Sequence, residues 1–80
     1  HKAAMYEGEL SIKHKELMAT AIAIAARCDG CIAAHVAAAL KAGASKQELV
    51  ETIDVAILMG GGPAVIYGTQ ALAAVDELAS

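Results

Sequence analysis

Tryptophan and phenylalanine are absent from this sequence of 80 residues, and two tyrosines are its only aromatic residues. Proline occurs once. Strands favour aromatic residues, whereas alanine, the best helix former, supplies 20 of the residues here. These features exclude an all-β fold. They predict a single all-α domain over residues 1–80, built as a small helical bundle.

Clusters of positive charge are missing as well. Six Lys and Arg residues stand against nine Asp and Glu residues, which gives a formal net charge of −3. Because proteins bind nucleic acid by neutralising phosphates with basic side chains, nucleic acid is not an expected partner. The apolar stretch from Leu17 to Ala26 has ten residues, about half of the ~20 that cross a bilayer. It predicts a buried helix and no membrane partner.

Cysteine is scarce, with Cys28 and Cys31 only, and no stretch has the composition of a secretory signal. Two thiols three positions apart without an export signal are typical of a redox-active or metal-bound pair in a reducing compartment. We therefore expect a cytoplasmic protein. Since 58% of the residues are apolar and so small a domain buries only about 60% of its surface on folding, we also expect a homo-oligomer.

Capping residues and glycines divide the chain into four expected helices. Ser11 is a candidate N-cap, Ser45 and Glu48 form a capping box, and Pro63 suits the first turn of a helix. The expected helices run from Ser11 to about Arg27, from about Cys31 to Ala42, from Ser45 to about Gly60, and from Pro63 to about Leu78.

Smaller expectations concern single positions outside the motifs. Residues 1–9 are interpreted as the end of a helix that lies upstream. Asp29 is expected to cap the second helix. His1 and His14 are expected to face solvent, and Met18 and Met59 to pack in the core.

The strongest chemical motif is Cys-x-x-Cys, formed by Cys28 and Cys31 and followed by His35. Cys31 and His35 are four positions apart, so on one helix they are neighbours, with roughly 5–6 Å between their Cβ atoms. An imidazole there can accept or relay a thiol proton. Cys28 lies at the helix start, where its sulfur can approach that of Cys31 and form a disulfide. A helix N-terminus beside Arg27 also favours the reactive thiolate.

Glu16 is expected to join this group from the preceding helix. If the two helices are antiparallel and the chain reverses midway between residues 16 and 35, Glu16 lies opposite His35. That midpoint falls near Ala25, whereas the clearest break is at Asp29 and Gly30, so the helices must cross at an angle or the chain must turn earlier. A carboxyl group on an apolar helix face either finds a partner or becomes a weaker acid, and both properties suit a proton relay.

The pattern of Glu16, Cys28, Cys31 and His35 closely resembles the alkylhydroperoxidase D-like branch of the carboxymuconolactone decarboxylase family. The spacing of these four residues is the specific part of a similarity that covers roughly residues 8–77. Some members of the branch have a histidine immediately before the second cysteine, where this chain has Gly30. Further similar segments are Leu10 to Lys13, Ala42 to Ala44 and Met59 to Ala64.

The resemblance implies an all-α protein that forms trimers or hexamers and reduces hydroperoxides as a thiol peroxidase. By this analogy Cys31 attacks the peroxide, Cys28 is the resolving thiol, and Glu16 and His35 relay protons. The implied activity requires no cofactor and no metal. A lipoyl-type dithiol is allowed as the electron donor. Gly30 in place of histidine implies a weaker proton relay.

Two alternatives to a thiol peroxidase stay open. One is a carboxymuconolactone decarboxylase-type enzyme, although family members with that activity generally lack the cysteine pair. The other is a non-enzymatic oligomeric module whose cysteines sense redox state or bind a metal. Cys28, Cys31 and His35 would then be ligands, with His14 or Glu16 as a fourth.

Overall fold

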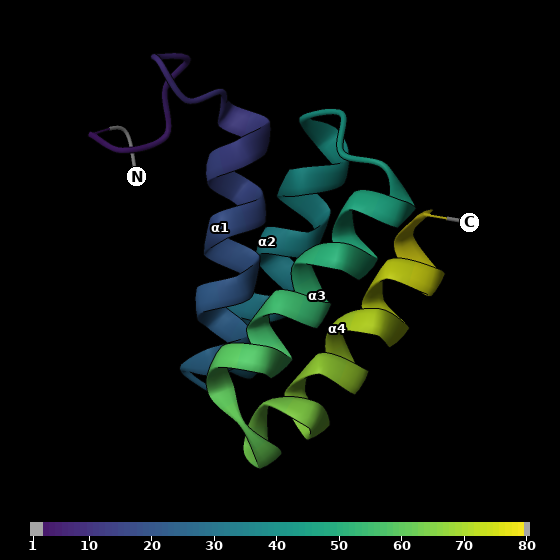
Figure 1. The fold of residues 1–80 in the computed structure, drawn as a ribbon. Coiled ribbons are helices and arrows are strands. Elements are labelled where there is room, and N and C mark those ends of the chain that lie inside the picture. Colours follow the sequence, from purple (N-terminus) through teal and green to yellow (C-terminus); the bar gives the residue numbers. More distant parts are fainter. Residues whose placement is uncertain (1–2, 80) are drawn as a thin grey trace.

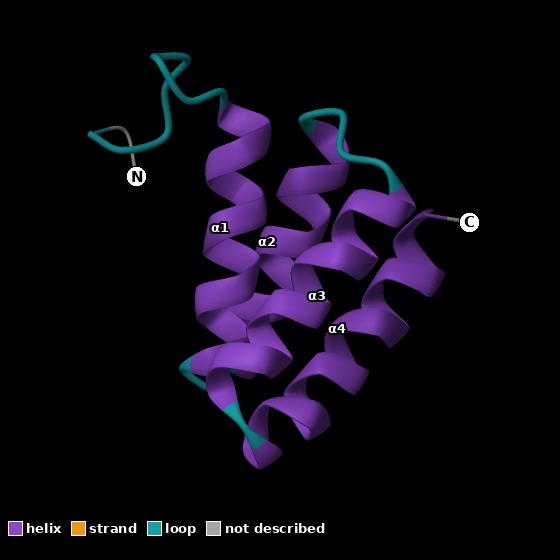
Figure 2. Ribbon diagram, viewed as in Figure 1, coloured by secondary structure: helices purple, strands orange, loops and turns teal. Residues whose placement is uncertain are grey.

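The fold is a bundle of four helices in the computed structural model, which describes residues 3–79 (Figure 1). Helix α1 spans Ile12–Ala25, α2 Asp29–Lys41, α3 Lys46–Gly60 and α4 Gly62–Ala79. Within residues 3–79 there is no strand (Figure 2), so the predicted all-α bundle is confirmed. His1, expected to face solvent, lies outside the described residues.

The starts of α1 and α3 follow the capping signals of the sequence. Ser11 is the N-cap of α1, and its Oγ accepts a hydrogen bond from the His14 backbone N–H at 3.0 Å. At the start of α3, Ser45 and Glu48 form the predicted capping box, in which each side chain accepts from the other residue's backbone N–H. His14 is exposed, as expected, and its Nδ1 lies 2.8 Å from the Ser11 Oγ.

Helix α1 ends at Ala25, two residues earlier than expected. The backbone N–H groups of Arg27 and Cys28 donate to the carbonyls of Ile24 and Ala23 at 3.1 and 3.0 Å, which is the Schellman pattern of a helix end. This pattern needs a left-handed residue, and Arg27 supplies it with φ 60°, although a side chain with a Cβ atom disfavours that conformation. The chain therefore turns earlier than the helix-breaking residues Asp29 and Gly30 indicate.

The start of α2 corrects a second expectation. Cys28 is the N-cap, whereas Asp29, expected to cap this helix, is its first helical residue, and Gly30 follows inside the helix. The Schellman turn occupies only Ala26 and Arg27, so Cys28 can cap the next helix, which begins two residues before Cys31, its expected start. The carboxylate of Asp29 in the first turn is favourably placed against the positive end of the helix dipole.

The helices surround one apolar core. Helix α1 packs against α2 and α3, and α4 packs against α2 and α3 (Figure 1). Helices α1 and α3 run in the same direction, since Lys13 contacts Glu48 near their starts and Gly60 lies beside Ala25 near their ends. The buried apolar residues are Ala23, Ile24, Ile32, Val36, Ala39, Ala44, Leu49, Ile53, Ala56, Ala64, Ala71 and Val75.

Two methionines expected in the core lie on the surface instead. Met18 is 44% exposed and Met59 is 77% exposed. Helical spacing places both on broad apolar stripes, but the core covers only part of each stripe, because α1 and α3 have no third helix over their outer sides. Part of the surplus of apolar residues is therefore found on this outer surface, and another part lies on α4, where Val65 and Ile66 are 49% and 63% exposed.

Residues 3–10, where the end of an upstream helix was expected, form turns and bends. The Nζ of Lys15 donates to the carbonyl oxygens of Ala4 and Tyr6, each at 2.9 Å, and lies 3.6 Å from the centre of the Tyr6 ring. These contacts hold the segment against α1. Among the described residues, no helix has both the length and the apolarity needed to cross a membrane.

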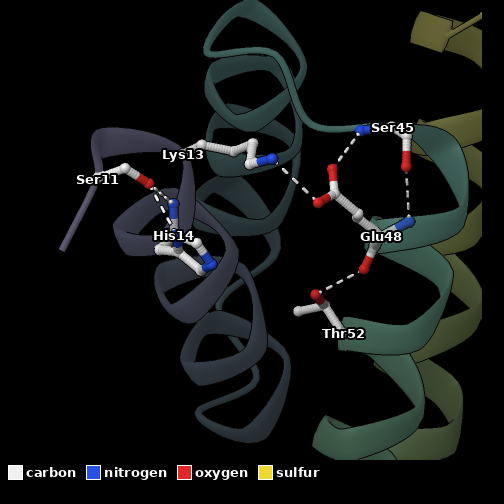
Figure 3. A network of polar contacts seen from close by, with 6 residues as sticks. All are labelled: Ser11, Lys13, His14, Ser45, Glu48 and Thr52. Carbon is white, nitrogen blue, oxygen red and sulfur yellow. Dashed lines mark hydrogen bonds and ion pairs between the residues drawn. The ribbon is translucent and has the colours of Figure 1, made fainter.

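A polar network joins α1 to the start of α3 (Figure 3). The Glu48 carboxylate accepts from the Ser45 backbone N–H at 2.8 Å and from the Lys13 Nζ at 3.1 Å. The hydrogen bond from Ser45 and the neighbouring ammonium of Lys13 lower the pKa of Glu48 below its ordinary value of 4.5. The charged carboxylate is therefore bound better in the folded chain than in the unfolded one.

This network predicts a pH-dependent loss of stability in acid. Because the pKa of Glu48 is lower in the folded state, its contribution is complete above about pH 5 and disappears as the pH falls through the folded-state pKa. The Glu48→Gln variant keeps a capping-box side chain. It is expected to unfold at lower urea concentration than the parent at pH 7, with a difference that shrinks towards pH 3.

The matched control is Glu51→Gln, one turn further along α3. Glu51 accepts from the side chain of Gln47 at 3.1 Å and forms no ion pair among the residues that the structure describes. Urea midpoints at both pH values are the measurement. Equal pH dependence of the two variants would show that the Glu48 network does not stabilise the fold.

Candidate functional site

The cysteine pair lies at the start of α2. Cys28 and Cys31 form a disulfide, with their Cα atoms 5.3 Å apart. As the N-cap and third residue of the helix, they are one turn apart, so the two sulfurs meet as the spacing predicted. Both residues are half-buried, which leaves the disulfide partly accessible to solvent.

The second part of the site is a carboxylate–imidazole pair between α1 and α2. The Nδ1 of His35 lies 2.7 Å from the Oε1 of Glu16, and these side chains are 19% and 10% exposed. This distance is that of a hydrogen bond between the carboxylate and the imidazole ring. The bond fixes the orientation of the imidazole, as a carboxylate bonded to one ring nitrogen of a histidine commonly does.

The early end of α1 explains why these two residues meet. Helix α1 stops at Ala25 and α2 starts at Asp29, so the chain reverses close to the point halfway between residues 16 and 35. A reversal there places Glu16 opposite His35. The turn was expected at Asp29 and Gly30, too late to place Glu16 opposite His35. The left-handed conformation of Arg27 lets the chain turn earlier and removes this mismatch. A glycine-based break further along the chain would have shifted the two helices relative to each other.

A pocket of about 280 Å³ opens beside the disulfide, between α1 and α2. Cys28, Cys31 and His35 form one part of its wall, and the remainder is apolar. The apolar lining residues are Ala19, Ile22, Ala23 and Ala26.

These four α1 residues were not predicted as part of the site. Their spacing of three, four and seven positions from Ala19 places them on one helix face, which is the signal that was available. Three of the four are alanines, whose small side chains leave the space beside the sulfurs open. Spacing alone did not show that this face borders the cysteine pair.

Gly30 and Tyr67 contribute no side chain to the pocket, and no further group of possible metal ligands lies nearby among the described residues. A Cβ atom added at Gly30 would meet no atom within 4 Å, so the position where some relatives have histidine is open. Tyr67 packs against the core and does not line the pocket. Within residues 3–79, no three His, Cys, Asp or Glu side chains are grouped so that they could hold a metal ion.

A four-helix bundle with a Cys-x-x-Cys disulfide at a helix start, beside a buried Glu–His pair, defines a class of small helical dithiol proteins. Comparison with known proteins gives the particular family. The model of the carboxymuconolactone decarboxylase family matches residues 1–77, and the chain belongs to this family.

The relatives agree with this assignment in sequence and in fold. An uncharacterised protein of Cupriavidus necator is 42% identical over 77 residues, which are 96% of this chain and 68% of the relative. A crystal structure of a carboxymuconolactone decarboxylase family protein from Legionella pneumophila superposes with a TM-score of 0.93 at 43% identity, covering 99% of this chain and 70% of that one.

A third relative carries a functional description. A family protein of Thermotoga maritima, described as having a possible involvement in an antioxidative response, has a TM-score of 0.91 at 33% identity. The match covers 98% of this chain and 67% of that one.

Proposed function

We propose that this protein is a thiol peroxidase of the alkylhydroperoxidase D-like branch, which reduces hydroperoxides through a dithiol/disulfide cycle of Cys28 and Cys31. The observation that carries the proposal is the bond between Glu16 and His35 beside the cysteine pair, with His35 and both cysteines on one pocket wall. Peroxide reduction by a thiol requires a thiolate, a second thiol and a proton source. The antioxidative description of the Thermotoga maritima relative is consistent with this chemistry.

The proposed cycle begins with both cysteines reduced. The Cys31 thiolate attacks one peroxide oxygen, so an S–O bond forms while the O–O bond breaks. The leaving alkoxide takes a proton supplied by the His35–Glu16 pair and departs as an alcohol. Cys31 is then a sulfenic acid, and the Cys28 thiol condenses with it to a disulfide and releases water.

An external dithiol completes the cycle. It exchanges with the disulfide of Cys28 and Cys31, becomes oxidised to its own disulfide and returns both protein thiols. The two electrons thus pass from the dithiol to the peroxide without a metal or another cofactor. The proposed partners are therefore a hydroperoxide, a dithiol donor of the lipoyl type and further copies of the chain.

The position of each group supports its proposed role. Cys31 precedes His35 by one helical turn, so the imidazole is a neighbour of Cys31 on the same helix face. Cys28 is the N-cap, where the free N–H groups of the first turn favour a thiolate in the reduced protein. The apolar lining from Ala19 to Ala26 suits the organic part of an alkyl hydroperoxide.

A thiol titration tests the proposal. Reduced protein, freed of reductant, is treated with one equivalent of cumene hydroperoxide. We expect both thiols of each chain to be lost with formation of one equivalent of alcohol, and dihydrolipoamide to restore them. Thiol loss no faster than that of free glutathione would contradict the proposal. Stoichiometric zinc in the freshly purified protein would contradict it as well, because the metal would occupy both thiols.

A further inference from the structure

Arg27 has an unfavourable backbone conformation in the turn between α1 and α2 (Figure 1). Within residues 3–79 it is the only residue other than glycine with a positive φ, at 60°. Glycine adopts this conformation without a penalty, whereas the Cβ atom of another residue disfavours it. Because strained backbone positions are concentrated at functional sites, the conformation of Arg27 indicates a use for its side chain.

The charge of Arg27 is not paired within the folded chain. Its side chain is exposed and forms no ion pair among residues 3–79, not even with Asp29 two positions on. It is the only arginine of the sequence and the only lysine or arginine between Lys15 and Lys41. A guanidinium group presents its N–H donors in a planar fork that matches a carboxylate. Arg27 is therefore available to an external anion.

The disulfide pocket begins beside this residue. Ala26 and Cys28, the two neighbours of Arg27 in the chain, both line the pocket. Along α1 the lining extends back to Ala19, over seven residues or ~10 Å of helix. On α2, His35 follows Cys28 by seven residues and lies towards the end away from the turn. The pocket thus extends from the proposed proton donor to the turn that carries Arg27.

We propose that this pocket binds organic hydroperoxides that also carry a carboxylate, and that Arg27 selects them. The peroxide group lies at Cys31 and His35, and the apolar body lies against the alanines of α1. The carboxylate accepts charge-assisted hydrogen bonds from the guanidinium at the turn. Because the chain has a net charge of −3, an anionic ligand needs such a local cation. Hydroperoxides of fatty acids and of aromatic acids belong to this class.

Binding of a carboxylate differs from an effect of Arg27 on the cysteines. A cation beside the cysteine pair also favours the thiolate in the reduced protein. The disulfide of Cys28 and Cys31 contains no thiolate, so binding to the oxidised protein reports the contact with the carboxylate alone. The alcohol products are suitable ligands, because they keep the apolar body and the carboxylate but cannot react.

NMR titration of the oxidised, ¹⁵N-labelled protein tests the inference. The two ligands are cumyl alcohol, the product of cumene hydroperoxide, and its para-carboxylate. Because Arg27 is the only arginine, its side-chain Nε–H gives a single signal. We expect the carboxylated alcohol to shift this signal, and to bind with a Kd about fivefold lower than that of cumyl alcohol, the upper range for an exposed ion pair.

Three variants complete the test. Arg27→Gln should bind both alcohols equally. Arg27→Gly should also lose the preference, yet unfold at a higher urea concentration than the parent, because glycine relieves the positive φ. The matched control Lys41→Gln removes the same charge at the far end of α2 and should keep the fivefold preference. Equal Kd values in the wild type, or an unchanged preference in folded Arg27→Gln, would overturn the inference.

The binding experiment separates this inference from the proposed peroxidase activity, on which its choice of substrate rests. Thiol loss to cumene hydroperoxide together with equal binding of the two alcohols would support the peroxidase and contradict the role of Arg27. Preferential binding of the carboxylated alcohol without thiol loss would support the carboxylate site and contradict the peroxidase.

Discussion

Replacing Cys31 with serine is expected to abolish hydroperoxide turnover, with a loss of at least a thousandfold. Cys31 is the cysteine one turn before His35, and a serine hydroxyl in its place does not reduce an O–O bond. Replacing Cys28 with serine should also stop turnover, but at a later step. The Cys31 thiolate of that variant still reacts once and remains a sulfenic acid, because no second thiol condenses with it.

Two measurements separate these variants. Steady-state peroxide consumption with dihydrolipoamide as donor should be lost in both. Trapping with dimedone, which labels sulfenic acids, should mark Cys28→Ser after one equivalent of peroxide and leave Cys31→Ser unmarked. The opposite labelling pattern would reverse the assigned roles of Cys28 and Cys31. Wild-type turnover in both variants would remove the cysteine pair from the mechanism altogether.

Replacing Glu16 with glutamine is expected to lower kcat/KM for cumene hydroperoxide by about a hundredfold, the lower end of general acid–base contributions. The carboxylate lies 2.7 Å from the His35 Nδ1 and is its partner in the proposed proton relay. Glutamine has nearly the same size and still accepts a hydrogen bond through its carbonyl oxygen. It has no charge to stabilise a protonated imidazole, so the proton transfer to the leaving alkoxide should slow.

The same variant must be separated from a simple loss of structure. The Glu16 side chain is only 10% exposed, and a disturbed buried hydrogen bond costs about 1–3 kcal/mol of unfolding free energy. Urea unfolding therefore accompanies the kinetics, and Glu51→Gln, the same change at an exposed position, is the control. A Glu16→Gln protein with wild-type kcat/KM, or with slow turnover that follows only its unfolded fraction, would remove Glu16 from the relay.

Local signals predicted most of the secondary structure. The caps at Ser11 and in the Ser45–Glu48 box lie where the sequence placed them, because a cap depends on contacts within one helical turn. The position of α1's end was not predictable in this way. Arg27 takes a left-handed conformation that its own side chain disfavours, and the Schellman bonds around it are satisfied only in the context of the folded turn.

In the candidate site, too, some residues were predictable from local sequence and others depend on tertiary packing. Cys28, Cys31 and His35 were identified from spacing on one helix, and the sequence alone determined that they share a short segment. Glu16 lies opposite His35 only because the chain turns early, and the position of this turn was decided by tertiary packing. The pocket beside the cysteines, with Ile22 on its rim, also arose only from the packing of α1 against α2.

The amino-acid sequence by itself determined that there are four helices, the caps of α1 and α3, the cysteine motif and an apolar content too large for one small core. Each of these depends on composition or on residues within a turn of each other. The tertiary structure decided which apolar residues are buried, where Met18 and Met59 are exposed, and that Glu16 meets His35. Helical periodicity shows that a stripe is apolar, but whether that stripe faces a neighbouring helix or the outer surface depends on how all four helices pack together.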